Sequence, residues 1–216
     1  MKNRIRRKFY PAICMLAAFV LWTAALQFVD IQTIGPLGSS VGFGTMNGFF
    51  HSLIGVNMPL YLLTDWLGLI PLCFMAGFGG LGLIQWIRRK QLWKVDGSIL
   101  LLGGFYVLVM AAYLLFEIFA VNYRPVLIGG NLEVSYPSST TMLVLCVMPT
   151  ASMQLCGRIQ NRVFRRWIFW CISVFTVLMV VGRLISGVHW FSDIVGGIFL
   201  SAGLVLLYRA FSDFID

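Results

Sequence analysis

Charged residues are scarce in this chain of 216 residues: they make up 11% of it, whereas 59% of the residues are hydrophobic and the mean hydropathy is +0.87. Soluble globular domains average about 25% charged residues, so this composition excludes an ordinary soluble domain. No polar stretch between the apolar runs is long enough to form a separate soluble domain. At about 20 apolar residues for each membrane-spanning helix, the length accommodates about six spans, and we expect one integral membrane domain over residues 1–216.

Cysteine is also sparse, and its distribution excludes two classes of small scaffold. The five cysteines all lie inside or at the edges of apolar runs, their number is odd, and no C-x-x-C pair occurs. A disulfide framework or a zinc site requires cysteines paired at regular spacings. We therefore expect the cysteines to be packing residues, and we expect neither a metal ion nor another cofactor.

Long apolar runs are abundant. Windows of spanning length predict six membrane helices in an all-α bundle, at residues 9–29, 58–87, 97–121, 138–157, 167–185 and 193–211. The first run is too long for the hydrophobic region of a cleaved signal peptide, so we interpret it as an uncleaved span. The Gly- and Ser-rich segment 30–57 becomes weakly amphipathic toward its end, which predicts a short interfacial helix on the outer membrane surface.

Basic residues are distributed asymmetrically among the predicted loops. Clusters of them precede the first span, separate the second from the third and separate the fourth from the fifth, and Arg209 lies near the C-terminus. Cytoplasmic segments carry an excess of Lys and Arg, so we expect a multi-pass protein of the cell membrane with both termini in the cytoplasm. Because the clusters form no single patch, we expect no nucleic acid partner. Of the 16 basic residues, only Arg124 and Arg183 fall at outer ends of spans.

Other polar residues accompany these two arginines at the outer ends of the predicted helices. The third span is followed by Arg124, the fourth begins at residues 138–141 with a run of hydroxyl side chains, and His189 and Asp193 lie between the fifth and the sixth. Guanidinium groups bind phosphate oxygens through paired hydrogen bonds, and free backbone N–H groups at a helix start bind anions. The four-residue spacing predicts that Asp193 accepts a hydrogen bond from one ring nitrogen of His189 and leaves the other free as a nucleophile.

These residues resemble the motifs of the type 2 phosphatidic acid phosphatase family. The chain contains R-x5-H-x3-D from Arg183 to Asp193, an upstream R-P at Arg124 and a P-S pair at Ser138, in the family's order. The resemblance implies a six-span bundle related to the vanadium haloperoxidases and a phosphohistidine intermediate. It implies that His189 is the nucleophile, that Asp193 orients it, and that Arg124, Ser138 and Arg183 bind phosphate. The free N–H groups at the start of the fourth helix add Ser139 and Thr140 to the expected phosphate-binding residues.

The chain departs from the family's pattern in three places. Glu117 stands where the first motif has lysine, Thr140 stands where the second has the histidine that protonates the leaving group, and Gly182 replaces the serine that usually begins the third. A positioned general acid contributes about 10²–10⁴-fold to a rate, so its loss slows the hydrolysis of alkyl phosphates. A diphosphate leaving group needs little protonation. The departures therefore favour a lipid diphosphate, such as a polyprenyl diphosphate, over phosphatidate as the substrate.

Two residues are candidates for a substitute acid. Glu117 lies two helical turns, about 10 Å, from Arg124 on about the same helix face. It is either a replacement general acid or a membrane acid that pairs with an arginine or stays protonated through desolvation. His51 is the second candidate, because its surface segment is able to fold back over the site; the alternative is an ordinary interfacial histidine.

From these observations we expect an integral membrane phosphatase that hydrolyses a phospholipid or a polyprenyl phosphate or diphosphate at the outer membrane face. Two alternatives stay open: a phosphotransferase that passes the headgroup to an alcohol instead of water, and a catalytically weak or inactive homologue that only binds phospholipid. A transporter or channel has less support, because charged residues in the middle of spans are scarce. The sequence identifies neither the lipid nor a protein partner.

Overall fold

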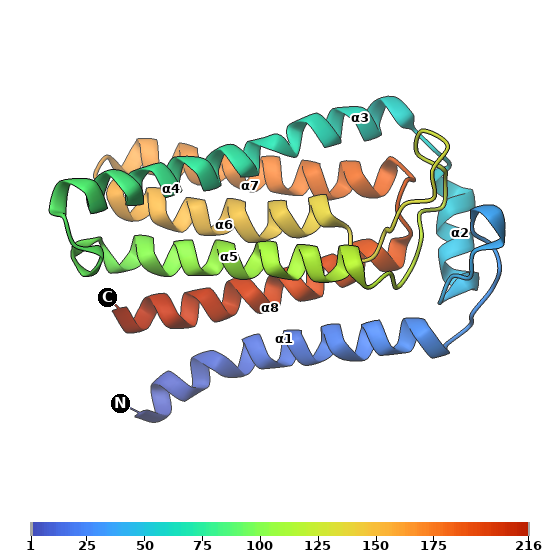
Figure 1. Ribbon diagram of the computed structural model, residues 1–216, viewed down its shortest axis with the longest axis horizontal. Coiled ribbons are helices and arrows are strands. Elements are labelled where there is room, and N and C mark those ends of the chain that lie inside the picture. Colours follow the sequence, from blue (N-terminus) through green and yellow to red (C-terminus); the bar gives the residue numbers. More distant parts are fainter. Residues whose placement is uncertain (1, 216) are drawn as a thin grey trace.

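The structure, a computed structural model, describes residues 2–215 and consists of helices joined by short connections (Figure 1). The α-helices within this range are α1 (Lys2–Phe28), α2 (Gly44–Ile54), α3 (Met58–Leu67), α4 (Leu69–Arg89), α5 (Gly97–Ile118), α6 (Ser139–Arg158), α7 (Arg162–Ile185) and α8 (Phe191–Ile215). Two 3₁₀ turns, η1 (Pro36–Gly38) and η2 (Leu92–Lys94), lie in the connections. The predicted all-α class is confirmed.

Within the described residues, six helical runs are long and apolar enough to cross a membrane, and the chain is a multi-pass membrane protein. The runs match the six predicted spans and differ from them mainly at the ends. The first helix begins before residue 9 and α7 begins at Arg162 rather than at 167, whereas α5 already ends at Ile118. Hydropathy windows stop at Lys and Arg, but both are good helix formers, so α1 and α7 continue through their basic ends.

The second predicted span corresponds to one apolar run of 32 residues, which is divided into the two helices α3 and α4. The break falls at Gly68, whose N–H is shared between the carbonyls of Thr64 and Asp65 at 3.0 Å each. Pro71 explains the position of the break, because a proline has no N–H to donate to the carbonyl four residues earlier, that of Leu67, and its ring collides with that carbonyl. The expectation of a single uninterrupted helix over 58–87 is therefore wrong at this point.

The long helices lie side by side, with both termini at one end of the bundle (Figure 1). At the other end α2 crosses the bundle, beside the loop that joins α5 to α6 and the turn that joins α7 to α8. Side chains fix α2 there: the rings of Phe50 and Phe191 stack with centroids 4.1 Å apart, and the Asn47 amide donates to the Ser192 hydroxyl at 2.9 Å. The short helix expected after the first span is therefore α2, and it packs on the start of α8.

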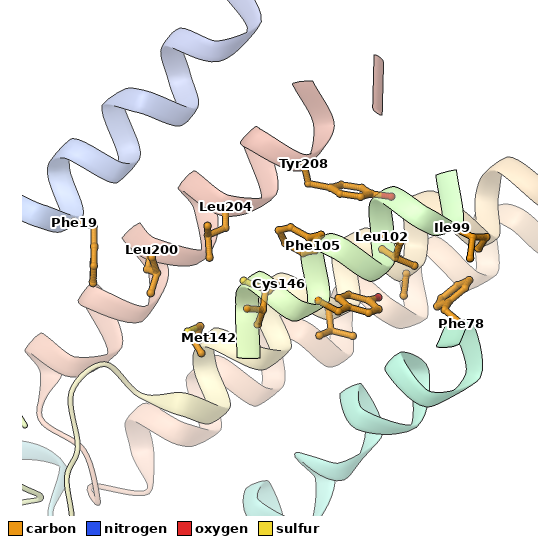
Figure 2. Close-up of a cluster of buried hydrophobic side chains, with 14 of the residues drawn as sticks. Phe19, Phe78, Ile99, Leu102, Phe105, Met142, Cys146, Leu200, Leu204 and Tyr208 are labelled. Carbon is orange, nitrogen blue, oxygen red and sulfur yellow. The ribbon is translucent and has the colours of Figure 1, made fainter. Parts of the chain in front are cut away.

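The main apolar core is formed by α5, α6 and α8, with contributions from α1 and α4 (Figure 2). Its buried side chains include Phe105 and Leu102 on α5, Cys146 on α6 and Leu204 on α8. Many large apolar side chains point outward, which suits helices whose outer faces contact lipid. The core holds the long helices in a fixed arrangement, so that the ends of α5, α6, α7 and α8 meet at the α2 end of the bundle.

Candidate active site

The loop between α5 and α6, residues 119–138, folds back on itself and presents Arg124. The backbone N–H of Arg124 donates to the Glu133 carbonyl at 3.0 Å, and the N–H of Ser135 donates to the Asn122 carbonyl at 2.9 Å. These paired hydrogen bonds keep the loop narrow. The side chain of Trp190, in the turn before α8, adds a hydrogen bond from its Nε1 to the Tyr123 carbonyl at 2.7 Å. The loop is thereby joined to the turn that carries His189.

His189 lies just before α8, and its ring is held by the backbone of the α5–α6 loop. Its Nδ1 is 3.2 Å from the carbonyl oxygen of Ser135, whereas the nearest carboxylate oxygen of Asp193 is 3.8 Å away. Because a carbonyl oxygen can only accept, Nδ1 carries the proton and Nε2 presents its lone pair. The structure therefore brings Asp193 next to His189, but it gives the orienting hydrogen bond to Ser135.

Asp193 instead stabilises the turn around the histidine. One of its carboxylate oxygens accepts from the backbone N–H of Trp190 at 2.9 Å, and the other accepts from the side-chain amide of Asn122 at 3.4 Å. Its backbone carbonyl accepts from the N–H of Ser138 at 3.2 Å. Ser138 is fully buried, and its N–H already donates to the carbonyl of Asp193. The prediction that this N–H points at a bound anion is therefore wrong.

The surroundings of His189 favour its neutral form. Burial lowers the pKa of His189 well below its usual range, and the positive charges of Arg124 and Arg183 lower that pKa further. The Nη1 of Arg124 lies 3.4 Å from Nε2, the ring nitrogen that is free of a proton. In this structure Nε2 accepts from Arg124, and a neutral imidazole in this position is suited to attack a phosphorus atom once the guanidinium turns its N–H groups to the phosphoryl oxygens.

Both arginines are buried, and Arg183 keeps an unsatisfied N–H group. Arg124 is 8% exposed, and its Nε lies 3.0 Å from a carboxylate oxygen of Glu133 in an ion pair that lacks the alignment of a hydrogen bond. Arg183 is 1% exposed, and its Nε has no hydrogen-bond partner. Buried guanidinium N–H groups are costly to leave unpaired, which indicates that an anionic ligand completes Arg183.

The two guanidinium groups meet at the ring of Tyr61 on α3. The Cζ of Arg183 lies 4.8 Å from the centroid of this ring, and the Cζ of Arg124 lies 5.7 Å from it. The predicted convergence of Arg124, Arg183 and His189 at one end of the bundle is therefore what the structure shows.

A cavity of about 280 Å³ opens beside Arg124 and His189. Glu117, from the last turns of α5, and Glu133 also line it, and so does Ser139 at the start of α6. The remaining walls are mostly apolar or aromatic and are formed by Ala112, Tyr113, Phe116, Val134, Ser135, Tyr136, Pro137 and Met142. Of the two candidates for a substitute acid, Glu117 is the one that shares this cavity with His189.

Arg183 does not line this cavity itself, but it meets the cavity residue Arg124 at the Tyr61 ring. Two other predicted site residues lie elsewhere. Thr140 faces the break between α3 and α4, since its methyl group would lie 3.5 Å from a Cβ added to Gly68, and it does not line the cavity. His51 packs against the indole of Trp190 with ring centroids 5.4 Å apart and is also absent from the cavity wall. Burial lowers the pKa of His51. The surface segment therefore supports the turn before α8 from outside and does not cover the cavity.

Sequence reasoning missed several residues that contact the arginines and the histidine. Tyr61, Thr64 and Asp65 on α3 contact Arg183, Glu133 contacts Arg124, and the carbonyl of Ser135 contacts His189. An acid inside an apolar run was the available signal for Asp65, because such residues are expensive in a membrane and usually functional. A backbone carbonyl has no sequence signal. Within residues 2–215, no three His, Cys, Asp or Glu side chains are grouped as a metal site would require.

The fold defines a multi-pass helical membrane protein, and its site gathers two buried arginines and a neutral histidine. The structure matches that of a transmembrane PAP2-type phosphatidylglycerolphosphate phosphatase from Bacillus subtilis with a TM-score of 0.65 and 18% sequence identity, over 96% of this chain and 98% of that chain. No curated protein matches the chain in sequence. The model of the PAP2 superfamily matches residues 102–215, and the chain belongs to this superfamily. Membership supports a lipid phosphatase, as the sequence motifs predict.

Proposed function

We propose that the chain hydrolyses a phosphorylated membrane lipid through a phosphohistidine on His189. Nε2 attacks the phosphorus atom, the bond from phosphorus to the leaving oxygen breaks, and the lipid leaves with a proton. Water then attacks the phosphohistidine, the bond between phosphorus and nitrogen breaks, and inorganic phosphate is released. The observation that carries this proposal is the neutral His189 beside Arg124, together with the buried Nε–H of Arg183, which has no partner.

Arg124 and Arg183 supply the positive charge that the reaction needs. Negative charge grows on the phosphoryl oxygens in the transition state, and guanidinium groups remain protonated at all relevant pH values. Ser139 lines the same cavity from the first turn of α6 and is placed to contact a phosphoryl oxygen. The backbone N–H of Ser138 donates to Asp193, and the methyl group of Thr140 faces the break between α3 and α4, so we propose Ser139 rather than these two side chains as the phosphate contact of this helix start.

Glu117 is the proposed proton donor to the leaving group. It lines the cavity at the position where the family's first motif has lysine, whereas neither Thr140 nor His51 reaches that cavity. A lipid diphosphate is the favoured substrate, because its leaving phosphate departs with little protonation and therefore tolerates an imperfect acid. The site is proposed to face the extracytoplasmic side, with both termini in the cytoplasm and residues 1–216 forming one membrane domain.

A phosphate-release assay on the purified protein tests the proposal. The wild type is compared with His189→Ala, Glu117→Gln and the control His51→Gln on phosphatidate, phosphatidylglycerophosphate and a polyprenyl diphosphate. We expect His189→Ala to abolish turnover while lipid binding persists, and His51→Gln to remain active. Glu117→Gln should slow the two monophosphates by about 10²-fold and the diphosphate much less.

Each of the other outcomes would indicate a different function. Absence of phosphate release by the wild type, with lipid binding unchanged in His189→Ala, would show a binding homologue. Transfer of the phosphoryl group to an added lipid alcohol would show a phosphotransferase. Equal wild-type rates on monophosphate and diphosphate lipids would refute the preference for a diphosphate.

A further inference from the structure

We infer that α3 positions one half of the phosphate clamp: Thr64 and Asp65, together with Tyr61, hold the guanidinium of Arg183 in the plane in which it meets the phosphoryl group. This inference rests on the proposed function, because it assigns Arg183 to phosphate binding. It adds three residues that act through Arg183 and that none of the recognised motifs contains.

The partners of Arg183 all come from α3. Its Nη1 lies 3.3 Å from the hydroxyl of Thr64 and 3.5 Å from the backbone carbonyl of Tyr61, and its Nη2 lies 3.4 Å from a carboxylate oxygen of Asp65. A guanidinium is planar and its N–H groups form a rigid fork, so contacts at both terminal nitrogens fix the direction of the third. The third is Nε, which is buried and has no partner. The arrangement holds the Nε–H in a fixed direction and leaves it without a protein partner.

Charge compensation follows the same plan at both arginines. Arg183 is paired with Asp65 and Arg124 is paired with Glu133. The Tyr61 ring accepts both guanidinium groups, and an aromatic face attracts cations. One carboxylate for each arginine and a shared ring allow two like charges to lie near one another before the substrate arrives. Without these groups nothing on the protein would offset the repulsion between the two cations.

The position of Asp65 is otherwise hard to explain. It lies within a membrane-spanning run, and its side chain is 55% exposed in the isolated chain. A charged side chain costs about 2.5–3.5 kcal/mol at the centre of a bilayer and less near its surface, so an acid here requires a compensating partner. Arg183, whose side chain is 1% exposed, is that partner.

Gly182 shows how closely α3 approaches the helix that carries Arg183. A Cβ at this position would lie 2.9 Å from the methyl carbon of Thr64, a distance that side chains essentially never show. The glycine that replaces the usual serine therefore lets Thr64 reach Arg183. Since α3 precedes the matched region 102–215, this half of the clamp is held by a part of the chain that the family model does not cover.

The test compares Asp65→Asn and Thr64→Val with wild type in the phosphate-release assay, with orthovanadate as a phosphate-like inhibitor. We expect each variant to lower kcat/KM, by about 10²-fold for Asp65→Asn, because small misplacements of a binding group cost this much. The inhibition constant of orthovanadate should rise with it. Thr64→Ser should restore activity. The matched control is Asp213→Asn, which removes an exposed ion pair with Lys8 and should leave activity unchanged.

A double-mutant cycle separates positioning from general support of the fold. In a background of Arg183→Lys, which retains charge but loses the fork, we expect Asp65→Asn to cause little further loss, since both changes remove the same arrangement. The inference would be overturned if the fold losses in kcat/KM of Arg183→Lys and Asp65→Asn multiplied in the double variant. It would also be overturned if Asp65→Asn and Thr64→Val both kept the wild-type kcat/KM and orthovanadate inhibition. An inactive wild type would refute the proposed function instead. Thr64→Val keeps the ion pair and serves if Asp65→Asn does not fold.

Discussion

The environment of His189 decides its protonation. The imidazole is 3% exposed, and each of the two nearby arginines disfavours a second positive charge. Its pKa is consequently lower than the ordinary value of 6.5. The histidine holds a lone pair on Nε2 without needing a base to remove a proton, and it reaches this state before any substrate binds.

The pH dependence of the reaction follows from this shift. In the proposed mechanism the free enzyme is competent when His189 is neutral, and kcat/KM reports the ionisation of the free enzyme. Because the folded-state pKa is lowered, activity should persist as the pH falls through 6.5 and decline only at lower pH. A profile of kcat/KM from pH 4 to 8 with a detergent-solubilised substrate measures the acid limb. An acid limb centred above pH 6.5 would contradict the described surroundings of His189.

At the residue scale, the sequence spacing predicted which residue lies next to His189 but not which residue forms a hydrogen bond with its ring. The four-residue spacing brings Asp193 to 3.8 Å from Nδ1, yet the hydrogen bond goes to Ser135. The reason is that α8 begins at Phe191, after the histidine. His189 therefore lies outside the helix, and the geometry of two residues on one helix face does not apply. Contacts to backbone carbonyls depend on loop conformation, which one sequence does not reveal.

At the scale of elements, close packing between α8 and the α5–α6 loop sets the position of the site. A Cβ on Gly196 of α8 would lie 2.5 Å from the Tyr136 ring. That ring is 1% exposed, stacks on Phe19 and exchanges a 2.6 Å hydrogen bond with Thr23 on α1, so it has no room to move aside. Tyr136 directly follows Ser135, whose carbonyl holds His189.

Gly196→Ala should therefore destabilise the protein by about 1–3 kcal/mol, the usual cost of overpacking, and reduce phosphatase activity with it. The matched control is Gly104→Ala on α5, where an added Cβ meets nothing within 4 Å. Since alanine favours a helix over glycine by about 1 kcal/mol, the control should be neutral or slightly stabilising. Thermal unfolding in detergent and phosphate release measure both. A Gly196→Ala protein as stable as wild type would show that Tyr136 yields.

Hydropathy predicts the six spans because each must carry a long apolar run, and it misses the break at Gly68 because both sides of the break are equally apolar. Proline at position 71 was the available signal. The placement of Thr140 was also beyond the sequence: the resemblance assigns it a catalytic position, but its direction depends on how α6 rotates against α3 and α4. Whether a segment forms a helix depends on its own residues, whereas the rotation of that helix about its axis depends on the helices it packs against.

At the scale of the whole molecule, the bundle has a basic end and an end that carries the site. The termini lie at one end with most of the basic clusters, and the α5–α6 loop lies at the other (Figure 1). Because cytoplasmic segments carry an excess of Lys and Arg, we propose that the terminal end faces the cytoplasm.

Cysteine labelling in intact cells measures this orientation. In a background without the natural cysteines, Asn131→Cys in the α5–α6 loop should react with a membrane-impermeant maleimide. Gln91→Cys, between α4 and α5, should react only after the cells are lysed; both positions are exposed. The reverse pattern would place the site in the cytoplasm and contradict the proposed outer location.

The break between α3 and α4 divides the supports of the site into two sets. The histidine turn, the α5–α6 loop and the start of α6 are joined by the bonds of Asp193, Ser135 and Trp190. Thr64 and Asp65 reach Arg183 from α3, which ends before Gly68. A substitution in α3 that removes these contacts therefore leaves the bonds around His189 in place, and the activity that survives it measures what the histidine and Arg124 achieve without a well-placed Arg183.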